Sequence, residues 1–399
     1  MRHLIATASL FALAACGLNG TDNEEPASDT VATADAGADY GYETYGEDNL
    51  ADSMASNDGA SSAPDAIADP EERPIMQAQV VLDRIGFGPG VIDGKMGMST
   101  ENALRGFQEA NNLDITGTLD DATKQALSEW QRIPATRVVT IPASWSDADY
   151  TDMPDDVAEQ AKLERLGYAT LDERLAERFH TTVAVLKMLN PDGKPAGFQA
   201  DGTPDTKPSA TPDVAKEDAQ KAAFFHAGQQ IRVPNIGADR IAPGSVDDTS
   251  WQQTLASLGV GTDQPAVDRI VVSKAGKTLK AYRGDKLIAL FTVSSGSSEF
   301  PLPLGEWKIL GEAYNPPYSY DPEVLGKNAG KTYKLAPGPN SPVGVVWIDL
   351  SKEHYGIHGT PDPETIGRAQ SSGCVRLTNW DAARLAGMVS QSTEVIFEA

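Results

Sequence analysis

Cysteine is almost absent from this sequence, which has only Cys16 and Cys374 in 399 residues. Long hydrophobic runs are absent too, because no apolar stretch reaches the ~20 residues that a membrane-spanning helix needs. Lys and Arg are missing altogether from residues 17–72, and the whole chain carries a net charge of -24. These absences exclude a membrane-spanning helix and argue against nucleic-acid binding, which requires basic patches. They also leave no second cysteine with which Cys374 could form a disulfide, since Cys16 ends an N-terminal export signal.

The first fifteen residues read as a secretory signal peptide. Arg2 gives a positive start, a short apolar core runs over 4–13, and small residues lead to Cys16. The four residues that end at Cys16, Leu-Ala-Ala-Cys, resemble the lipobox of bacterial lipoproteins, which implies that Cys16 is the acylated first residue of the mature chain. Gly17, in place of Asp, implies onward transport to the outer membrane, so we expect a periplasmic protein held there by lipid. A plain secretory signal is the alternative.

Residues 16–72 form an acidic segment in which Asp and Glu alternate with Ala, Ser, Gly, Asn and Thr. A segment of this composition buries too little apolar surface to offset its ordering entropy, so we expect it to stay disordered. It supplies most of the net charge and reads as a solvated tether between a lipid anchor and the folded domains. A partner-binding acidic tail is the alternative. The remainder of the chain is long enough for two or three domains.

Residues 73–131 carry the pattern of three short helices joined by glycine-rich turns, which predicts a small three-helix bundle. Apolar residues recur at helical spacing over 75–85, over 100–107 and from Asp120 to Trp130. The segment resembles a peptidoglycan-binding domain of the three-helix type through Val91-Ile92-Asp93-Gly94, Gly97, Thr100, Ala103-Leu104, Phe107-Gln108, Asn111, Thr116-Gly117 and Leu119-Asp120. The resemblance implies wall binding, although most of these residues build the fold.

The region 134–240 predicts a small α/β module with two helices. Residues 171–190 form two amphipathic helical stretches that meet near His180, and residues 228–235 have a strand-like ending. Together they resemble a LysM-type module. A Pro/Gly/Ala-rich insertion at 191–216 and the lack of a clean first strand depart from that pattern, so glycan binding and a spacer role are equally open.

Residues 266–399 read as a mainly-β domain with one helix. β-prone runs at 269–273, 278–282 and 286–294 are separated by turn signals, which predicts antiparallel strands. Further strands are expected at 345–348, 355–357 and 393–397. Thr378, with Asp381 three residues on, is the expected cap of the helix. The chain is thus predicted to be a multidomain α+β protein that ends in a β-sandwich or barrel, with the Cys374 loop leading into its helix.

An unpaired thiol in an exported protein tends to be oxidised, so one that is kept near a histidine indicates a nucleophile. Cys374 follows His358 by sixteen residues. A thiol with a pKa of ~8.5 needs a base at neutral pH, and an imidazole can take the proton and return it. Gly373 leaves room for a carbonyl, so that the N–H groups of Gly373 and Cys374 can form an oxyanion hole. Arg376 offers a fork for a substrate carboxylate, and the carbonyl of Gly359 can orient the imidazole.

These residues resemble the catalytic domain of the YkuD-type L,D-transpeptidases. The family signature is a His-Gly-Thr segment, a spacer, and then Ser/Thr-His/Ser-Gly-Cys-Val/Ile-Arg. It stands here as His358-Gly359-Thr360 followed by Ser371-Ser372-Gly373-Cys374-Val375-Arg376. Supporting matches are Gly305-Glu306-Trp307, Lys334-Leu335-Ala336-Pro337-Gly338-Pro339, Pro342-Val343-Gly344, Asn379 and Asp381. The one departure is Ser372, where many members have a second histidine.

The resemblance implies acyl transfer on the stem peptides of peptidoglycan. Cys374 would attack the diamino-acid carbonyl that precedes the terminal D-Ala, release D-Ala and form a thioester. An amine of another stem would resolve the thioester as a 3-3 cross-link. His358 would act as base and then as acid, oriented by Gly359. The residues expected to contact the substrate are Arg376, Ser372 and Tyr355, with core packing as an equal reading of Tyr355. No cofactor is implied, and carbapenems are expected to acylate the cysteine.

Other readings stay open. The acceptor could be a stem amine, a lysine of an outer-membrane lipoprotein, or water, and water would make the chain an L,D-carboxypeptidase. A non-catalytic wall tether with a vestigial last domain is a second class of function, which the intact catalytic motif disfavours. A metal site is not expected, because His354 and His358 lack a third ligand. His180 and His226 have no partners at metal-ligand spacing and read as structural or exposed.

Overall fold

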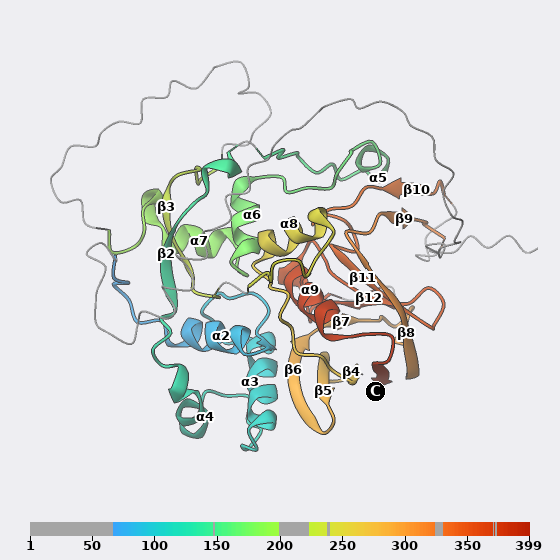
Figure 1. Cartoon of the computed structure of the whole chain (residues 1–399), viewed down its shortest axis with the longest axis horizontal. Coiled ribbons are helices and arrows are strands. Elements are labelled where there is room, and N and C mark those ends of the chain that lie inside the picture. Colours follow the sequence, from blue (N-terminus) through green and yellow to red (C-terminus); the bar gives the residue numbers. More distant parts are fainter. Residues whose placement is uncertain are drawn as a thin grey trace, which may run out of the picture. The chain divides into compact units, whose positions relative to one another are not determined.

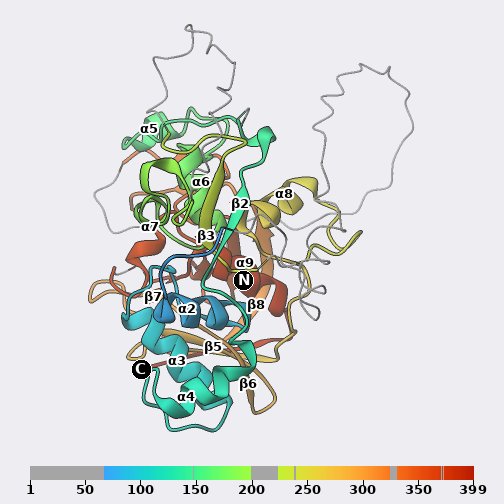
Figure 2. The same ribbon diagram turned by 90° about the vertical axis from the view of Figure 1, so that its left-hand side faces the viewer.

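The structure is a computed structural model in which residues 67–146, 148–198, 223–237, 240–323, 330–369, 371 and 373–399 are described. The expected signal peptide, Cys16 and nearly all of the acidic tether lie outside these residues. Asp65–Ala399 form one unit, in which three groups of elements follow each other along the chain (Figure 1; Figure 2 gives the side view). None of the helices in the described ranges has the length and apolar character needed to cross a membrane.

The first group is helical. It consists of α2 (Pro74–Arg84), α3 (Met98–Ala110) and α4 (Asp121–Ala126), which continues as the 3-10 turn η2 (Leu127–Trp130). Pro74 suits the first turn of α2, where no N–H donor is needed, and the Asp120 carboxylate caps α4 by accepting the Thr123 N–H at 2.9 Å. The three predicted helices are confirmed. Their core cluster also takes in Leu287 and Leu290, which belong to the C-terminal sheet.

A two-residue strand joins this helical group to the C-terminal sheet. Strand β1 (Phe87–Gly88) pairs in parallel with β6 (Lys286–Thr292). Before it, Gly86 has a φ of +92°, and its carbonyl accepts the Leu290 N–H at 3.1 Å. On α3, Gly106 lies so close to the same leucine that a Cβ would come within 2.9 Å of it. The sequence indicates only a turn in this stretch, because two paired residues leave no periodicity to detect.

The second group is a small α/β module. Its elements are β2 (Thr136–Thr140), η3 (Ala143–Trp145), α5 (Val157–Gln160), α6 (Leu171–Arg178), α7 (Val183–Leu189), η4 (Pro191–Gly193) and β3 (Gln230–Pro234). Strands β2 and β3 pair antiparallel. Thr170 and Thr182 cap α6 and α7 by accepting backbone N–H groups at 3.1 and 3.2 Å, which confirms the predicted helix pair.

The expectation that a clean first strand is missing from this module is wrong. Strand β2 is that strand, and it was hidden because its partner β3 follows only after both helices and the insertion. Most of the predicted insertion at 191–216 lies outside the described residues. The resemblance to a LysM-type module stays a prediction.

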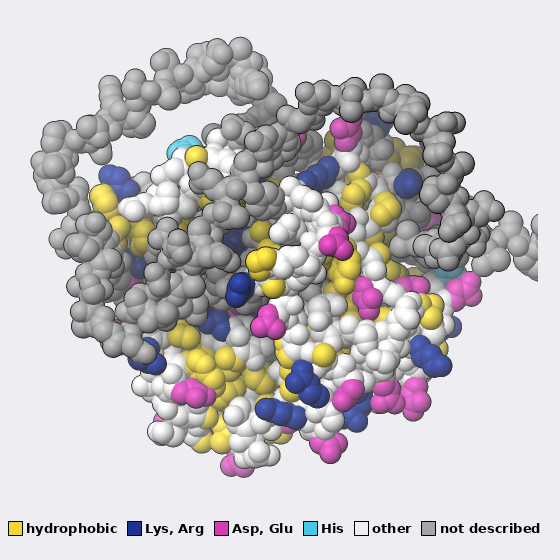
Figure 3. Space-filling view, viewed as in Figure 1, with side chains coloured by type: hydrophobic (Ala, Val, Ile, Leu, Met, Phe, Trp, Pro, Cys, Tyr) yellow, Lys and Arg dark blue, Asp and Glu magenta, His cyan; other side chains and the backbone are white. Residues whose placement is uncertain are grey.

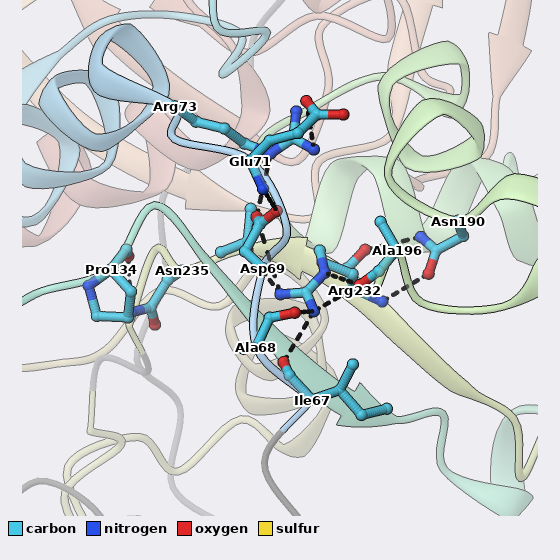
Figure 4. A network of polar contacts seen from close by, with 11 residues as sticks. Ile67, Ala68, Asp69, Glu71, Arg73, Pro134, Asn190, Ala196, Arg232 and Asn235 are labelled. Atoms are coloured by element: carbon cyan, nitrogen blue, oxygen red, sulfur yellow. Dashed lines mark hydrogen bonds and ion pairs between the residues drawn. The ribbon is translucent and has the colours of Figure 1, made fainter. Parts of the chain in front are cut away.

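A buried arginine ties the start of the described chain to this module (Figure 4). Arg232 of β3 is 2% exposed. Its guanidinium donates to the carbonyls of Ile67 and Ala68 at 2.8 and 3.0 Å and to the Thr136 hydroxyl at 3.0 Å. That hydroxyl donates in turn to Asp69 at 2.6 Å. A buried cation needs such partners because an uncompensated charge is costly inside a protein, and the network therefore fixes residues 67–69 against β2 and β3.

The third group holds most of the strands. Its main sheet has the order β1-β6-β5-β4-β14-β8-β11-β12-β13-β7. The strands not yet given are β4 (Arg269–Ser273), β5 (Thr278–Arg283), β7 (Ser294–Ser295), β8 (Gly305–Tyr314), β11 (Val346–Leu350), β12 (Gly356–His358), β13 (Val375–Arg376) and β14 (Glu394–Glu398). Strands β9 (Tyr318–Tyr320) and β10 (Tyr333–Leu335) pair with each other separately. The mainly-β domain, its antiparallel start and the predicted later strands are confirmed.

Two helices complete the third group. Helix α8 (Thr249–Leu258) contacts α9 (Asn379–Met388), and α9 packs on β11 and β12 (Figure 1). As predicted, α9 follows the Cys374 loop, and the Thr378 hydroxyl caps it by accepting the Asp381 N–H at 3.1 Å. The helix therefore begins just after the predicted nucleophile and packs against β12, the strand that carries His358.

One buried polar cluster joins the three groups. Asp83 of α2 is fully buried and accepts both ends of the Arg384 guanidinium of α9 at 2.8 and 3.0 Å. Between α6 and α7, His180 has its Nδ1 3.2 Å from the Asp83 carboxylate and its Nε2 2.9 Å from the Leu258 carbonyl oxygen, and its ring stacks on Trp380. Burial alone would raise the pKa of Asp83, but Arg384 and His180 outweigh burial and lower it. His180 is thus structural, and His226 is exposed.

The surface seen in Figure 3 mixes the two signs of charge. Acidic and basic side chains are interspersed there, and neither gathers into a large area of one sign. Large exposed hydrophobic side chains of the described residues are scattered along the chain: Met96, Ile115, Met188, Phe198, Leu304, Leu310 and Tyr314. Single exposed side chains of this kind are normal on a protein surface.

Candidate active site

Cys374 lies in the loop that leads into β13, where its thiol is partly exposed. The Ser371 hydroxyl holds its backbone by donating to the Cys374 carbonyl at 2.5 Å, and it accepts the Gly296 N–H at 2.7 Å. The sulfur lies 3.7 Å from the carbonyl oxygen of His354. The loop is therefore held at Gly296, next to the end of β7. Ser371 was indicated in the sequence only by its place in the motif.

His358 ends β12 and is 4% exposed. Its Nδ1 lies 2.7 Å from the Gly359 carbonyl oxygen, and because a carbonyl only accepts, Nδ1 carries the hydrogen. Nε2 is then the ring nitrogen that can take a proton. The Trp347 indole of β11 stacks on the ring, with the two centroids 5.4 Å apart. The expected contact between Gly359 and His358 is thus present, and Trp347 adds a support that the sequence did not indicate.

The pKa of His358 is lowered to about 3. Burial is the larger cause, because an apolar surrounding disfavours the cation, and the Arg376 guanidinium adds to it by repulsion. The Gly359 carbonyl acts the other way, since it favours the protonated ring. At neutral pH the imidazole is therefore uncharged, which is the form that a general base requires.

Arg376 lies beside His358 because β12 and β13 run parallel with these two residues in register. The Nε atom of Arg376 is buried and has no hydrogen-bond partner among the residues that the structure describes. A buried donor without a partner is costly, and a carboxylate is a ligand that a guanidinium binds well. The side chain is therefore suited to hold an anion next to the imidazole, the role that the sequence predicts for it.

Gly373 has a φ of +105°, a conformation that favours glycine. A Cβ at this position would lie 2.6 Å from the Tyr355 ring. Tyr355 therefore packs directly on the backbone of the cysteine loop, where it restricts how the loop can move. Ser372, the other residue expected to contact the substrate, lies outside the described residues.

Asn379 is a site residue that the sequence indicated only as part of the motif. It begins α9 and is fully buried. Its Oδ1 accepts the Val345 N–H at 3.3 Å. A Cβ on Gly344 or Gly359 would come within 1.9 or 2.2 Å of that oxygen, so both positions must be glycine. Asn379 thus lies directly against the residue that orients His358.

His354 presents its backbone rather than its ring to the site. It has a φ of +66°, its carbonyl faces the Cys374 sulfur, and its Nε2 lies 3.6 Å from Glu353. Within the described parts of the chain, no group of three or more His, Cys, Asp or Glu side chains could hold a metal ion. The chemistry on hand is that of a thiol, a neutral imidazole and a guanidinium.

Two family models match the chain. The model described as "L,D-transpeptidase catalytic domain" (YkuD) matches residues 267–397, and the one described as "Putative peptidoglycan binding domain" matches residues 72–127. The first match covers the main sheet from β4 onward, the Cys374 loop and α9. The second covers α2, α3 and α4. These two resemblances, predicted from the sequence, are confirmed.

Two of the solved structures that align with part of the chain come from mycobacteria. The L,D-transpeptidase from Mycobacterium smegmatis has a TM-score of 0.28 and 23% identity, with 33% of this chain and 58% of that one covered. L,D-transpeptidase 3 from Mycobacterium tuberculosis, in complex with a faropenem-derived adduct, has a TM-score of 0.28 and 18% identity, with 43% and 75% covered. This chain therefore spans less than two thirds of the Mycobacterium smegmatis structure.

Relatives among curated proteins are more similar in sequence. The "Putative L,D-transpeptidase YkuD" of Bacillus licheniformis is 33% identical over 177 residues, which are 44% of this chain and 88% of that protein. The protein of the same name in Bacillus subtilis is 32% identical over 126 residues, which are 32% of this chain and 63% of that protein. The likeness to the first of them extends over most of its length. The chain belongs to the YkuD family of L,D-transpeptidases.

Proposed function

We propose that this chain is a cysteine-dependent L,D-transpeptidase that joins peptidoglycan stem peptides by 3-3 cross-links. The observation that carries the proposal is the placement of His358, whose Nδ1 is bound to the Gly359 carbonyl at 2.7 Å and whose strand β12 pairs with β13, the strand that follows Cys374. A neutral imidazole with a free Nε2, beside the strand that Cys374 leads into, is the arrangement of a thiol nucleophile and its base. Membership of the family supports peptidoglycan as the substrate.

The first half-reaction forms a thioester. The Cys374 thiol gives its proton to Nε2 of His358, and the sulfur bonds to the carbonyl carbon of the diamino acid that precedes the terminal D-Ala. The N–H groups of Gly373 and Cys374 stabilise the oxyanion that forms. Collapse of this intermediate breaks the C–N bond, and His358 returns the proton to the amine of the leaving D-Ala.

The second half-reaction passes the acyl group to an acceptor. An amine from another stem attacks the thioester carbonyl and gives a proton to His358, and the C–S bond breaks. The proton then returns to the Cys374 sulfur, so that the site is restored. Arg376 holds a carboxylate of the stem, which its buried and unpartnered Nε supports. All of these steps use side chains and backbone groups of the chain.

We further propose that the enzyme works at the cell wall from a lipid anchor. The signal-like N-terminus and the lipobox resemblance at Cys16 support an acylated, periplasmic protein, held at the outer membrane. The acidic segment would let the folded part reach away from that membrane. The peptidoglycan-binding family match at 72–127 supports retention of the enzyme on its substrate.

Digestion products test this function directly. The purified mature chain is incubated with disaccharide-tetrapeptides, and the muropeptides are separated and weighed. We expect release of D-Ala and 3-3 dimers, both abolished by Cys374→Ala. Tripeptides without dimers would make the chain an L,D-carboxypeptidase and overturn the cross-linking assignment.

Acylation by a carbapenem tests the nucleophile without the natural substrate. Meropenem should add one covalent adduct to the intact chain, and Cys374→Ala should prevent it. A wild-type chain that forms neither adduct nor product would contradict the enzyme assignment and favour the non-catalytic wall tether. An adduct that persists in Cys374→Ala would place the nucleophile elsewhere.

A further inference from the structure

The middle module holds a loop of the catalytic domain through hydrogen bonds. Residues 337–340 lie between β10 and β11, in the segment that resembles the family's substrate loop. Leu166 donates to the Pro337 carbonyl and accepts the Asn340 N–H, both at 3.0 Å. The Asn340 side chain donates to the Glu173 carboxylate of α6 at 2.8 Å. The loop is therefore fixed from outside the catalytic sheet.

Glu177 extends this contact to α9. It lies near the end of α6, is 8% exposed, and accepts the Asn379 side-chain N–H at 2.7 Å. The same amide nitrogen donates to the Pro339 carbonyl at 3.1 Å. Burial raises the pKa of Glu177 to about 7, although hydrogen bonds from Tyr168 and Asn379 act against it. Asn379 is thus held from both sides, by the module and by the loop.

Asn379 connects Glu177 with the proposed base, His358, through Gly359. Its Oδ1 lies against Gly359, so close that no Cβ would fit between them. The Gly359 carbonyl in turn binds Nδ1 of His358 at 2.7 Å. A continuous path of contacts therefore runs from α6 to the imidazole, through Glu177, Asn379, Gly359 and His358. A shift at its first member would change the position of the carbonyl that fixes the ring.

A pocket of about 250 Å³ lies beside this contact, lined by residues of α6 and α7 and by the loops at 339–340 and 361–364. Next to it, the hydrogen bonds of Asn340 and Asn379 connect α6 with the catalytic domain.

We propose that Glu177 is a positioning residue for the reaction given above: through Asn379 it holds Gly359 in place, so that His358 presents Nε2 to Cys374. The inference rests on the proposed function only in taking His358 as the base. It gives the middle module a part in catalysis, in addition to the glycan-binding and spacer roles that the sequence leaves open.

The tautomer and the protonation of the His358 ring can be measured directly to test this positioning role. The chain has five histidines, so His358 can be assigned in ¹⁵N–¹H spectra of the labelled protein by comparison with His358→Gln. In the wild type we expect an uncharged Nδ1–H ring from about pH 5 to about pH 8, because its pKa is about 3. In Glu177→Ala the ring should populate the other tautomer and take up a proton closer to the ordinary ~6.5. Glu177→Gln should keep the wild-type spectrum, since its amide oxygen can still accept from Asn379.

A second buried acid in α6 gives a matched control for the kinetics. Asp172 is 6% exposed and accepts the backbone N–H groups of Phe224 and Phe225 within the module. We expect Glu177→Ala to lower kcat for D-Ala release at least about tenfold with KM changed less than about twofold, the pattern of a lost transition-state interaction. Asp172→Ala should lower Tm but leave kcat unchanged, and Glu177→Gln should lose less than about threefold.

If Glu177→Ala does not fold, the proposal is tested with a swapped pair, in which Asn379→Asp is combined with Glu177→Gln. Asn379→Asp sets a second carboxyl group against Glu177 and should lower kcat. Adding Glu177→Gln restores a donor between the two positions and should recover kcat at least about threefold.

Three results would overturn the proposal: a wild-type His358 spectrum in Glu177→Ala, an equal loss of kcat in Asp172→Ala, or no recovery in the swapped pair. If the wild type releases no D-Ala but the His358 spectrum changes as expected, the proposed function fails, whereas the restraint of the His358 ring by Glu177 is still supported.

Discussion

The low pKa of His358 has a measurable consequence for the pH dependence of acylation. A histidine with the ordinary pKa of 6.5 loses its base function between about pH 7 and about pH 5, whereas His358, with a pKa of about 3, keeps it. The Arg376 guanidinium helps to lower this pKa, so Arg376→Gln should raise it. The fall in acylation rate on the acidic side of the pH profile should then occur at a higher pH. The measurement is the rate of Cys374 acylation by meropenem from about pH 4 to about pH 8. Arg376→Lys keeps the positive charge, so the pH at which the rate falls should not change.

Two outcomes would contradict this account of the base. A fall in rate near the ordinary histidine pKa in the wild type would mean that the ring is charged in the resting enzyme. A fall at an unchanged pH in Arg376→Gln would mean that the guanidinium does not act on His358. The variants are compared by the pH at which the acylation rate falls and not by the maximal rate, because Arg376 is also expected to bind a carboxylate of the reagent.

The reacting residues were predictable from the sequence because each has its own chemistry. Cys374 and His358 stand out by residue type and spacing. Ser371 and Asn379 act on backbone groups, and a hydroxyl or amide in a motif looks the same whether it binds solvent or a neighbouring peptide. Glu177 lies 202 residues from its partner, so that only the folded chain brings it to the site.

Helix α9 depends on a cap that lies next to the cysteine loop. Thr378 is fully buried, and its hydroxyl accepts the Asp381 N–H at 3.1 Å. Thr378→Ala should lower the free energy of unfolding by about 1–2 kcal/mol, since it removes the partner of an otherwise unsatisfied donor. It should also slow acylation of Cys374, because Asn379 begins the same helix. Urea unfolding and acylation rates check this, and Thr378→Ser should lose less than half as much stability. Equal losses in the two variants would assign the effect to the methyl group.

Elements with local signals were predictable, and elements with distant partners were not. The start of α4, the cap of α9 and the amphipathic pair α6 and α7 were predicted from short stretches of sequence. Helix α8 carries such signals too, with Asp248 as its cap and Gly259 at its end, and could have been found from them. Strands β1 and β2 pair with segments much later in the chain, so their own residues do not show that they are strands.

Across the whole molecule, buried polar contacts reinforce the apolar contacts between the three groups of elements. Asp83, His180 and Arg384 meet out of solvent, one from each group. Glu177 reaches Asn379 in the same way. Such groups are costly to bury unless every partner is present, so they specify how the groups dock. Composition and periodicity identify each group separately, but they hold no information on these contacts.

The docking of the groups is tested most sharply at Asp83. Asp83→Asn keeps the size of the side chain but removes the buried carboxylate that pairs with the Arg384 guanidinium. We expect the free energy of unfolding to fall by about 3–5 kcal/mol. We also expect the helical group to unfold in urea ahead of the catalytic sheet, whereas the wild type should lose both in one transition.

The pH dependence separates this loss of charge from a packing defect. The pKa of Asp83 lies below its ordinary value of 3.8 in the folded chain, so its contribution is fully present above about pH 4 and is lost as the pH falls further. The stability difference between wild type and Asp83→Asn should therefore shrink as the pH falls below about pH 4. Glu109→Gln is the matched control, because it breaks a partly exposed ion pair to Lys280 of β5 and should cost less than about 1 kcal/mol. An equal cost for both variants, or a difference that does not shrink in acid, would contradict the role given to the buried charge.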